Sequence, residues 1–331
     1  MSVRRPAVLL VLAAAAVAWG TWAVVSPPAA LRAGPLLVDI PAQESAFGIA
    51  DRLHDSGAIR SRIGFVALSL VRGSVRSLKA GEYELPRRAS TLEVLALLES
   101  GRVRQHPVLH PEGATLAELA RTLEAARLAQ AVDVIRTATD PAFLRSQGIE
   151  GPSAEGYLFP DTYHFVRGMT VEQLLGRMVQ RMQQKLTVEM RERATARHLT
   201  IHELLTLASI IEREAMVRDE RPIISAVFWN RLRLGMPLQA DPTVQYAVGK
   251  ERRALTRADL QAEHPYNTYL RVGLPPGPIA SPGLHAIAAT LDPAPVSYLY
   301  FVKKDDQRHH FSATAEEHNT AVARYRLTRA R

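Results

Sequence analysis

The sequence predicts an α+β protein that starts with a single membrane-spanning helix and continues with a small α/β module and a mixed α/β domain. Three observations carry this prediction. No charged residue occurs from Pro6 to Leu31. A pattern of proline, helix-capping Ser or Thr, and apolar residues spaced four apart then occurs three times between residues 41 and 123. In the second half of the chain, capped amphipathic helices alternate with loops rich in Gly and Pro.

The N-terminal segment is predicted to cross a membrane. Residues 7–25 give 19 mostly apolar positions, close to the roughly 20 that a helix needs to span a bilayer. A cleaved signal peptide is the alternative, but its apolar core is usually shorter and no clear cleavage site follows directly. Arg4 and Arg5 precede the segment, and Arg32 is the first charge after it. The positive-inside rule therefore places the tail, residues 1–6, in the cytoplasm and the rest of the chain outside.

After a linker at residues 26–34, the repeated pattern predicts short helices that follow strands. The capping residues are Ser45, Ser90 and Thr115, each four positions after a proline. The last two also form capping boxes with Glu93 and Glu118. Strands are expected at residues 36–40, 78–85 and 108–110. The product is a small α/β module, or a pair of modules, from about residue 35 to residue 140.

Residues 153–165 combine two acids with four aromatic residues, although aromatic residues make up only 6% of the chain. The rings alternate with a period of two around Pro160, which predicts an extended, kinked path. Such a path holds Glu155 against a wall of rings. A carboxyl against apolar surface has a raised pKa and can deliver a proton at neutral pH. The alternative is that Glu155 only caps the element and that the rings belong to the core.

Two capping boxes, Thr170 with Gln173 and Thr200 with Glu203, predict the next two helices. The second of them ends in a sequence with two acids, Glu212 and Glu214. Residues two apart lie about 200° apart around a helix, so at most one of these acids faces the same cleft as Glu155.

A third helix is expected to open at Arg221-Pro222, because proline is tolerated in the first turn, and to end near Gly235. The C-terminal part is predicted to form a hairpin with strands at 298–302 and 310–313, followed by a helix capped by Thr314 and Glu317.

Loops rich in small polar groups lie between the third helix and the hairpin. Residues 238–246 contain Asp241 as an expected N-cap before Pro242, and Tyr266-Asn-Thr-Tyr269 leads into the Pro- and Gly-rich segment 273–283. Long ordered loops of this kind usually carry function.

Composition and motif searches exclude several classes of function. The chain has no cysteine, which rules out disulfides and thiolate metal sites. The net charge of +8 suits an anionic partner, but no nucleic-acid-binding pattern accompanies it. Neither the His198/His202 pair nor the histidines at 309, 310 and 318 have a zinc-binding spacing. Nucleophile elbows and phosphate-binding loops are absent too. An acid beside aromatic rings and polar loops, outside a membrane, suits a carbohydrate substrate.

Five motifs occur in order across some 130 residues, running from Glu155 to Tyr163, Ala208 to Glu214, Leu238 to Thr243, Tyr266 to Tyr269 and Gly273 to Gly283. Together they resemble the motifs of the YceG-like family of endolytic murein transglycosylases. The segments 298–302 and 311–319 extend the resemblance toward the carboxyl end. The family layout implies a LysM-like module at residues 35–105, where the sequence diverges more, and a catalytic domain at residues 106–331.

The resemblance implies a bacterial enzyme anchored in the inner membrane, with its catalytic domain in the periplasm and the cell-wall synthesis machinery as a partner. Such an enzyme cleaves the MurNAc-GlcNAc β-1,4 bond within nascent peptidoglycan strands, leaves 1,6-anhydro-MurNAc ends and limits strand length. No cofactor, metal or nucleic acid is expected. The acid of the Glu-Gly-x-x-x-Pro-Asp-Thr motif is catalytic in this family, which assigns that role to Glu155. One acid is enough, because the substrate's own C6 hydroxyl replaces a second carboxyl.

The residues expected to hold the sugar are Gln239, Asp241, Thr243, Tyr246, Asn267 and Tyr269, with Glu212 as a further candidate. Two alternatives stay open. A muramidase would hydrolyse the bond with two carboxylates, Glu155 and either Asp161 or Glu212. A membrane protein that binds peptidoglycan without cleaving it is the other.

Overall fold

The computed structural model describes residues 8, 14–15, 18–22, 24–28, 35–41, 43–86, 88–250, 252–305 and 307–329. They fall into two compact units. Unit 1 comprises residues 1–107 and 164–169, and unit 2 comprises residues 108–163 and 170–331. In the described part of the chain, no helix has both the length and the apolar character to cross a membrane. The predicted span at residues 7–25 lies largely outside the described residues and stays a prediction.

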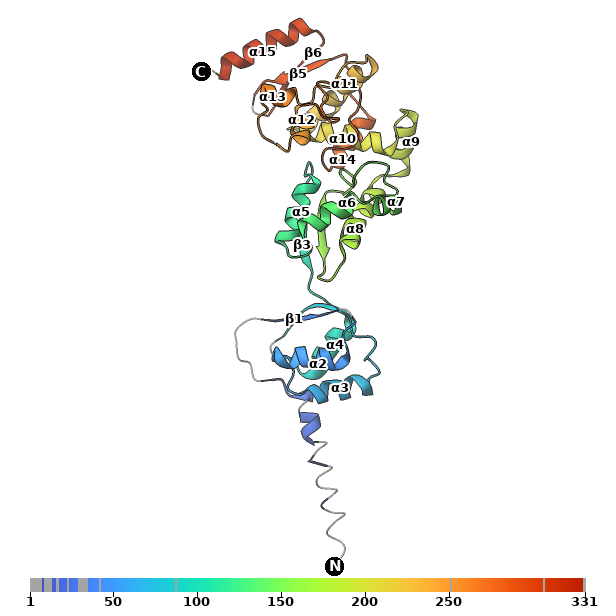
Figure 1. The fold of residues 1–331 in the computed structure, drawn as a ribbon, viewed down its shortest axis with the longest axis vertical. Coiled ribbons are helices and arrows are strands. Elements are labelled where there is room, and N and C mark those ends of the chain that lie inside the picture. Colours follow the sequence, from blue (N-terminus) through green and yellow to red (C-terminus); the bar gives the residue numbers. More distant parts are fainter. Residues whose placement is uncertain are drawn as a thin grey trace, which may run out of the picture. The chain divides into compact units, whose positions relative to one another are not determined.

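From residue 35 on, the described residues of unit 1 form a two-stranded antiparallel sheet with three helices (Figure 1). In chain order the elements are β1 (Leu36–Ile40), α2 (Ala46–Asp55), α3 (Arg62–Val71), β2 (Gly81–Leu85) and α4 (Thr91–Ser100). The strands pair from Leu36↔Leu85 to Ile40↔Gly81. Alternation along β1 sends Val38 and Ile40 into the core, where they join Leu53, Phe65 and Leu95. The predicted strands and capped helices of this region are confirmed. Helix α3, which has no proline before its cap, was not predicted.

A buried carboxylate joins three separate segments of unit 1. Glu82 on β2 lies with its Oε2 2.7 Å from His106 Nε2, and its Oε1 is 3.4 Å from Arg167 Nη1. The amide of Arg104 donates to the Glu82 carbonyl at 2.6 Å. Residues 104–107 and 164–169 are the two stretches in which the chain passes between the units, and both are held by this one residue.

Unit 2 is mainly helical. Its first half contains α5 (Leu116–Ala125), α6 (Ala131–Ala138), α7 (Pro141–Ser146), α8 (Val171–Lys185) and α9 (Val188–Ala196). Its second half contains α10 (Ile201–Glu214), the 3-10 turn η1 (Arg218–Glu220), α11 (Arg221–Arg233), α12 (Asp241–Ala247), α13 (Arg257–Leu260), α14 (Leu284–Leu291), β5 (Tyr300–Lys303), β6 (His309–Ser312) and α15 (Ala315–Arg329). The strands β3 (His106–His110) and β4 (Asp161–Phe165) pair with each other, and the division between the units falls within both.

Helix α10 is the centre of unit 2. Leu204, Leu207, Ile210 and Ile211 on it are completely buried, and it packs against α11, α12 and α14 (Figure 1). A helix that is apolar on nearly every side must lie inside a core. Its C-terminal end therefore carries the polar residues Glu212, Arg213 and Glu214 from the core toward the surface.

The capping boxes that start α5, α8 and α10 were predicted correctly from the sequence. Thr115, Thr170 and Thr200 each accept from the amide three residues on, and the acid or amide there returns the bond to the cap. The hairpin and the helix capped by Thr314 and Glu317 are also present.

The extended path predicted for residues 153–165 is only half right. Asp161–Phe165 forms β4, but the amide of Tyr157 donates to the Ala154 carbonyl at 3.1 Å, which closes a turn. The turn requires a left-handed conformation at residue 156, and Gly156 adopts it at φ +77°.

Candidate active site

Glu214 is the last residue of α10 and lies half-buried at the end of the central helix. Burial and, to a smaller extent, the negative charge of Asp241 raise its pKa to about 8, against the opposing charges of Lys303 and Arg213. A carboxyl with this pKa is protonated at neutral pH and can lose the proton without a large cost. Its half-buried position leaves it open to a ligand, which a fully buried acid is not.

Asp241 and Tyr269 stand next to this acid. The Tyr269 hydroxyl donates to Asp241 Oδ1 at 2.6 Å, and burial together with the Asp241 charge raises the tyrosine pKa far above its usual value. Asp241 was predicted to be the N-cap of a helix. The N-cap is instead Ala240, and Asp241 occupies the first helical position, which leaves its exposed carboxylate free to meet Tyr269. Gln239, also exposed, precedes them in a left-handed conformation at φ +51°.

Two of the predicted sugar-binding residues are buried and form hydrogen bonds that hold the loops together. Thr243 is completely buried and hydrogen-bonds to the Ala240 carbonyl at 2.7 Å and to the Thr268 hydroxyl at 2.8 Å. Asn267 is completely buried too: its Nδ2 donates to two loop carbonyls, and its Oδ1 accepts from the Tyr269 amide at 2.9 Å. Neither side chain can contact a sugar, because both are enclosed by protein. They fix the loops that present Gln239, Asp241 and Tyr269.

An aromatic pair lies on the same loops. The rings of Tyr246 and Tyr266 are 5.0 Å apart between centroids and tilted by 47°. Burial raises the pKa of Tyr266 to about 12, and the nearby Glu155 charge contributes to that rise. Tyr246, half-buried on α12, is the more accessible of the two, and its predicted role in sugar binding stays a prediction.

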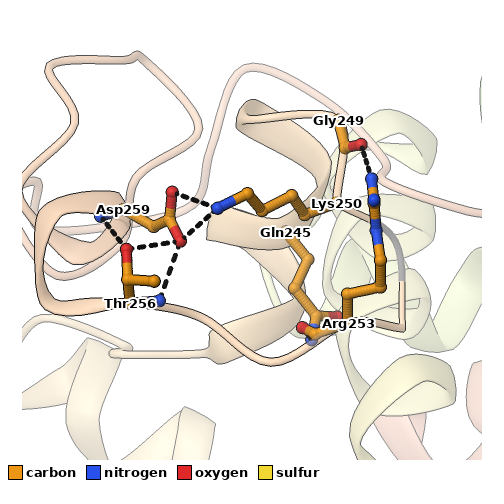
Figure 2. Close-up of polar contacts among 6 residues, drawn as sticks. All are labelled: Gln245, Gly249, Lys250, Arg253, Thr256 and Asp259. Carbon is orange, nitrogen blue, oxygen red and sulfur yellow. Dashed lines mark hydrogen bonds and ion pairs between the residues drawn. The ribbon is translucent and has the colours of Figure 1, made fainter.

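A network of side chains fixes the loop that joins these two tyrosines (Figure 2). Lys250 Nζ lies 2.8 and 2.7 Å from Oδ1 and Oδ2 of Asp259, and Oδ2 also accepts from the amide and the hydroxyl of Thr256. Gln245 donates to the Arg253 carbonyl at 2.7 Å, and Arg253 donates to the Gly249 carbonyl at 2.9 Å. The loop is therefore tied to the end of α12 at several points.

Glu155 is only 2% exposed. Both of its carboxylate oxygens lie 3.0 Å from the amide of Leu116, at the first turn of α5. Burial raises its pKa to about 8, and the hydrogen bonds from Leu116 and Gly156 only partly oppose this effect. The predicted rise in pKa is present, but the carboxyl has almost no exposed surface through which to reach a ligand.

The pKa of Glu155 makes stability depend on pH. The ordinary pKa of 4.5 becomes about 8 in the folded chain, so between these values the unfolded chain loses a proton that the folded chain keeps. Stability therefore falls as pH rises through this window, by about 1.4 kcal/mol per unit of pKa difference, and is level below it. Glu155→Gln cannot ionise. We expect its melting temperature to exceed that of the unmodified protein at pH 8 and to match it at pH 4. Equal melting temperatures at both pH values would contradict the burial argument.

Glu212 is the acid of this pair that the sequence analysis named as a possible sugar-binding residue. Both of its carboxylate oxygens have partners within the protein. Its Oε1 lies 2.6 Å from Nη2 of the buried Arg221, and its Oε2 accepts from the Gly283 amide at 3.0 Å. Glu212 thus joins α10 to α11 and to the start of α14. Asp161 is paired with Arg181 at 2.8 Å, and that pairing together with the Thr162 amide keeps its pKa low against the opposing effect of burial. Both acids have structural partners rather than a free face.

The sequence left open which acid of the pair faces a cleft, since their 200° separation allows only one of them to do so. Glu214 lies in the last turn of α10, where the helix dipole disfavours a negative charge and so adds to the preference for the protonated form.

The chain matches known proteins along most of its length. The model of the YceG-like family matches residues 38–324. An endolytic murein transglycosylase of Bacillus subtilis (strain 168) is 33% identical over 304 residues, which cover 87% of this chain and 84% of that protein. One of Streptococcus pneumoniae (strain R6) is 32% identical over 87% of this chain, which spans only 58% of the pneumococcal protein. The crystal structure of a putative yceG-like protein from Listeria monocytogenes superposes with a TM-score of 0.61 at 35% identity, covering 86% of this chain and 98% of the other.

Proposed function

The chain belongs to the YceG-like family, and from this premise we propose that it is an endolytic lytic transglycosylase of peptidoglycan. Its substrate is the glycan strand, cut at the MurNAc-GlcNAc β-1,4 bond. The observation that supports this function best is a half-buried carboxyl, Glu214, whose pKa of about 8 makes it an acid at neutral pH. The carboxylate of Asp241 acts on it, and Asp241 and Gln239 are exposed polar groups on the neighbouring segment that can meet sugar hydroxyls.

We propose Glu214 as the acid, in preference to Glu155. Both carboxyls have a pKa near 8, so protonation alone does not separate them. Access does. The acid must come within about 3 Å of the glycosidic oxygen, and Glu155 is enclosed behind the first turn of α5. The role predicted for Glu155 is open to test in the same experiment, which is described in the Discussion.

The reaction needs one acid that changes role. Protonated Glu214 gives its proton to the glycosidic oxygen, and the bond from that oxygen to the MurNAc anomeric carbon breaks, which frees a GlcNAc hydroxyl. The Glu214 carboxylate then removes the proton of the MurNAc C6 hydroxyl as this oxygen bonds to the anomeric carbon. The products are a 1,6-anhydro-MurNAc end and a regenerated acid, and no water is consumed. A pKa near neutrality serves both steps, since the group must both give and take a proton.

The residues proposed to act with Glu214 have different roles. Gln239, Asp241 and Tyr269 offer hydrogen-bonding groups to the sugar, and Tyr246 offers a ring face. The negative charge of Asp241 also holds Glu214 protonated. Arg213, whose Nη1 donates to the Gly113 carbonyl at 3.1 Å, is a positioning residue with a positive charge that favours the carboxylate in the second step.

The pH profile tests the part played by Asp241. Asp241→Asn keeps an acceptor for the Tyr269 hydroxyl but removes the charge that raises the Glu214 pKa. We expect the alkaline limb of kcat/KM to move to lower pH by about one unit, because the acid loses its proton earlier. Asp292→Asn, at an exposed position, is the control. An unmoved limb would remove Asp241 from the proton chemistry.

The products test the function. After incubation with peptidoglycan, mass spectrometry of the released muropeptides should show anhydro ends, whereas hydrolysis would give reducing ends.

A two-carboxylate muramidase is the second candidate function. The charge interaction between Glu214 and Asp241 favours these two residues as its pair of carboxylates. Binding to peptidoglycan without release of fragments would show a non-catalytic protein.

The predicted span at residues 7–25 implies an anchor in the inner membrane that keeps the site on the periplasmic side, where nascent strands are made. An anchored endolytic enzyme there would limit strand length and act beside the synthesis machinery.

A further inference from the structure

One face of α3 is apolar and exposed. Ile63, Leu70 and Val71 have exposed fractions of 78%, 64% and 86%, and they lie at positions i, i+7 and i+8, on one side of the helix. Phe65, on the opposite side of α3, and Val66, on its flank, are buried in the core of unit 1. Exposed apolar stripes of this kind on a packed helix mark a surface for another apolar phase.

The N-terminal apolar segment ends against this same helix. Arg60, just before α3, places its guanidinium 4.6 Å above the Trp22 ring and donates to the Pro27 carbonyl at 2.9 and 2.7 Å. A Cβ at Gly64, in the first turn of α3, would lie 3.4 Å from Val24 Cγ2. Figure 1 shows α3 as the helix of unit 1 next to this segment. The stripe therefore starts where the predicted membrane span ends.

The segment that carries the stripe contains only basic charges, and acids of α2 and α4 pair with two of them. Residues 56–81 contain no Asp or Glu, and their cations are Arg60, Arg62, Arg72, Arg76 and Lys79. Arg62 and Arg72 form surface ion pairs with acids of α2 and α4, and Arg76 is exposed. A helix with an apolar face and flanking cations binds at the boundary of headgroups and acyl chains, most strongly in anionic lipid.

We infer that α3 lies on the membrane surface, with Ile63, Leu70 and Val71 inserted among the lipid headgroups and Arg76 beside their phosphates. The occupant of this face is phospholipid rather than protein, because the face adjoins the segment predicted to cross the bilayer. This inference rests on the proposed anchoring. Unit 1 is then held to the membrane at two places, the span and α3.

The absence of cysteine allows a direct test. Single variants Ile63→Cys, Leu70→Cys and Val71→Cys in the full chain are labelled with an environment-sensitive fluorophore and reconstituted in phosphatidylcholine-phosphatidylglycerol vesicles. Val132→Cys and Val188→Cys, exposed apolar positions on α6 and α9 of unit 2, are the matched controls. We expect lipids with a nitroxide near the headgroup to quench the α3 probes at least about threefold more than the controls, and aqueous iodide to quench them less.

Two outcomes would overturn the inference. Probes on α3 that iodide quenches as strongly as the controls lie in water. Probes protected from iodide but untouched by lipid nitroxides lie against protein, such as a second copy of the chain. Flotation of the vesicles separates these results from a failed anchor, since a chain that does not float with lipid contradicts the anchoring itself. Release of anhydro-muropeptides by the same vesicles reports on catalysis independently.

Discussion

Glu214→Gln should lower the release of anhydro-muropeptides by about 10²–10⁴-fold, because the amide can neither protonate the glycosidic oxygen nor accept the C6 hydroxyl proton. The replacement keeps the size of the side chain, and it removes a carboxyl whose charged form is disfavoured by burial. The folded state should therefore survive, with a melting temperature at or above that of the unmodified protein. Initial rates of anhydro-muropeptide release and thermal melts, measured on the same preparations, give both quantities.

Glu155→Gln is the comparison that separates the two acids. If Glu155 acts only inside the fold, this variant keeps most of the activity, because glutamine can still accept from the Leu116 amide. Glu192→Gln, at an exposed position on α9, is the matched control for the loss of one carboxyl. Near-normal release by a folded Glu214→Gln protein, together with a large loss in Glu155→Gln, would return the acid role to Glu155. Equal loss in both would point to two essential carboxyls.

Gly156→Ala should be strongly destabilising. Gly156 has φ +77°, and a Cβ there would clash with Pro278 Cβ and lie 3.3 Å from the Ala280 carbonyl oxygen. The left-handed backbone costs a non-glycine residue about 1–2 kcal/mol, and overpacking adds about 1–3 kcal/mol. Together these effects would lower the free energy of unfolding by about 2–5 kcal/mol. They also displace the turn that carries Glu155.

Gly148→Ala separates the two contributions. Gly148 has φ +68°, but a Cβ there meets nothing within 4 Å, so it carries the backbone cost alone. Denaturant unfolding of both variants should show the larger loss for Gly156→Ala. If the two variants lose the same stability, the contact with Pro278 contributes nothing, and the segment 278–280 can move away freely.

Local signals allowed much of the fold to be predicted. Each capping Ser or Thr fixes a helix start through bonds that span three residues, so Ser90, Thr115, Thr170 and Thr200 could be read directly. The turn at Gly156 could not, because its conformation is decided by contact with residues more than a hundred positions away. Helix α3 was missed for a related reason, since its apolar residues cover both the buried and the exposed face and give no single stripe.

The candidate site, too, could be predicted from the sequence only in part. Of the residues chosen from the sequence motifs, Gln239 and Asp241 are exposed, and Tyr246 and Tyr269 are half-buried. Residue type alone could not distinguish these from Thr243 and Asn267, which have the same chemistry but satisfy backbone groups inside the loops. The choice between Glu212 and Glu214 depended on Arg221 and Gly283, whose positions relative to α10 are set by tertiary packing.

The cluster at Glu82 bears on how this chain can evolve. Unit 1 is not one continuous block, because residues 164–169 belong to it and Arg167 there shares the buried carboxylate with His106. Recombination that removed residues 1–107 as a cassette would leave Arg167 without its counterion, and a transplanted cassette would leave Glu82 short of one cation. Residues 1–107 and the stretch 164–169 are therefore both needed for this cluster to form.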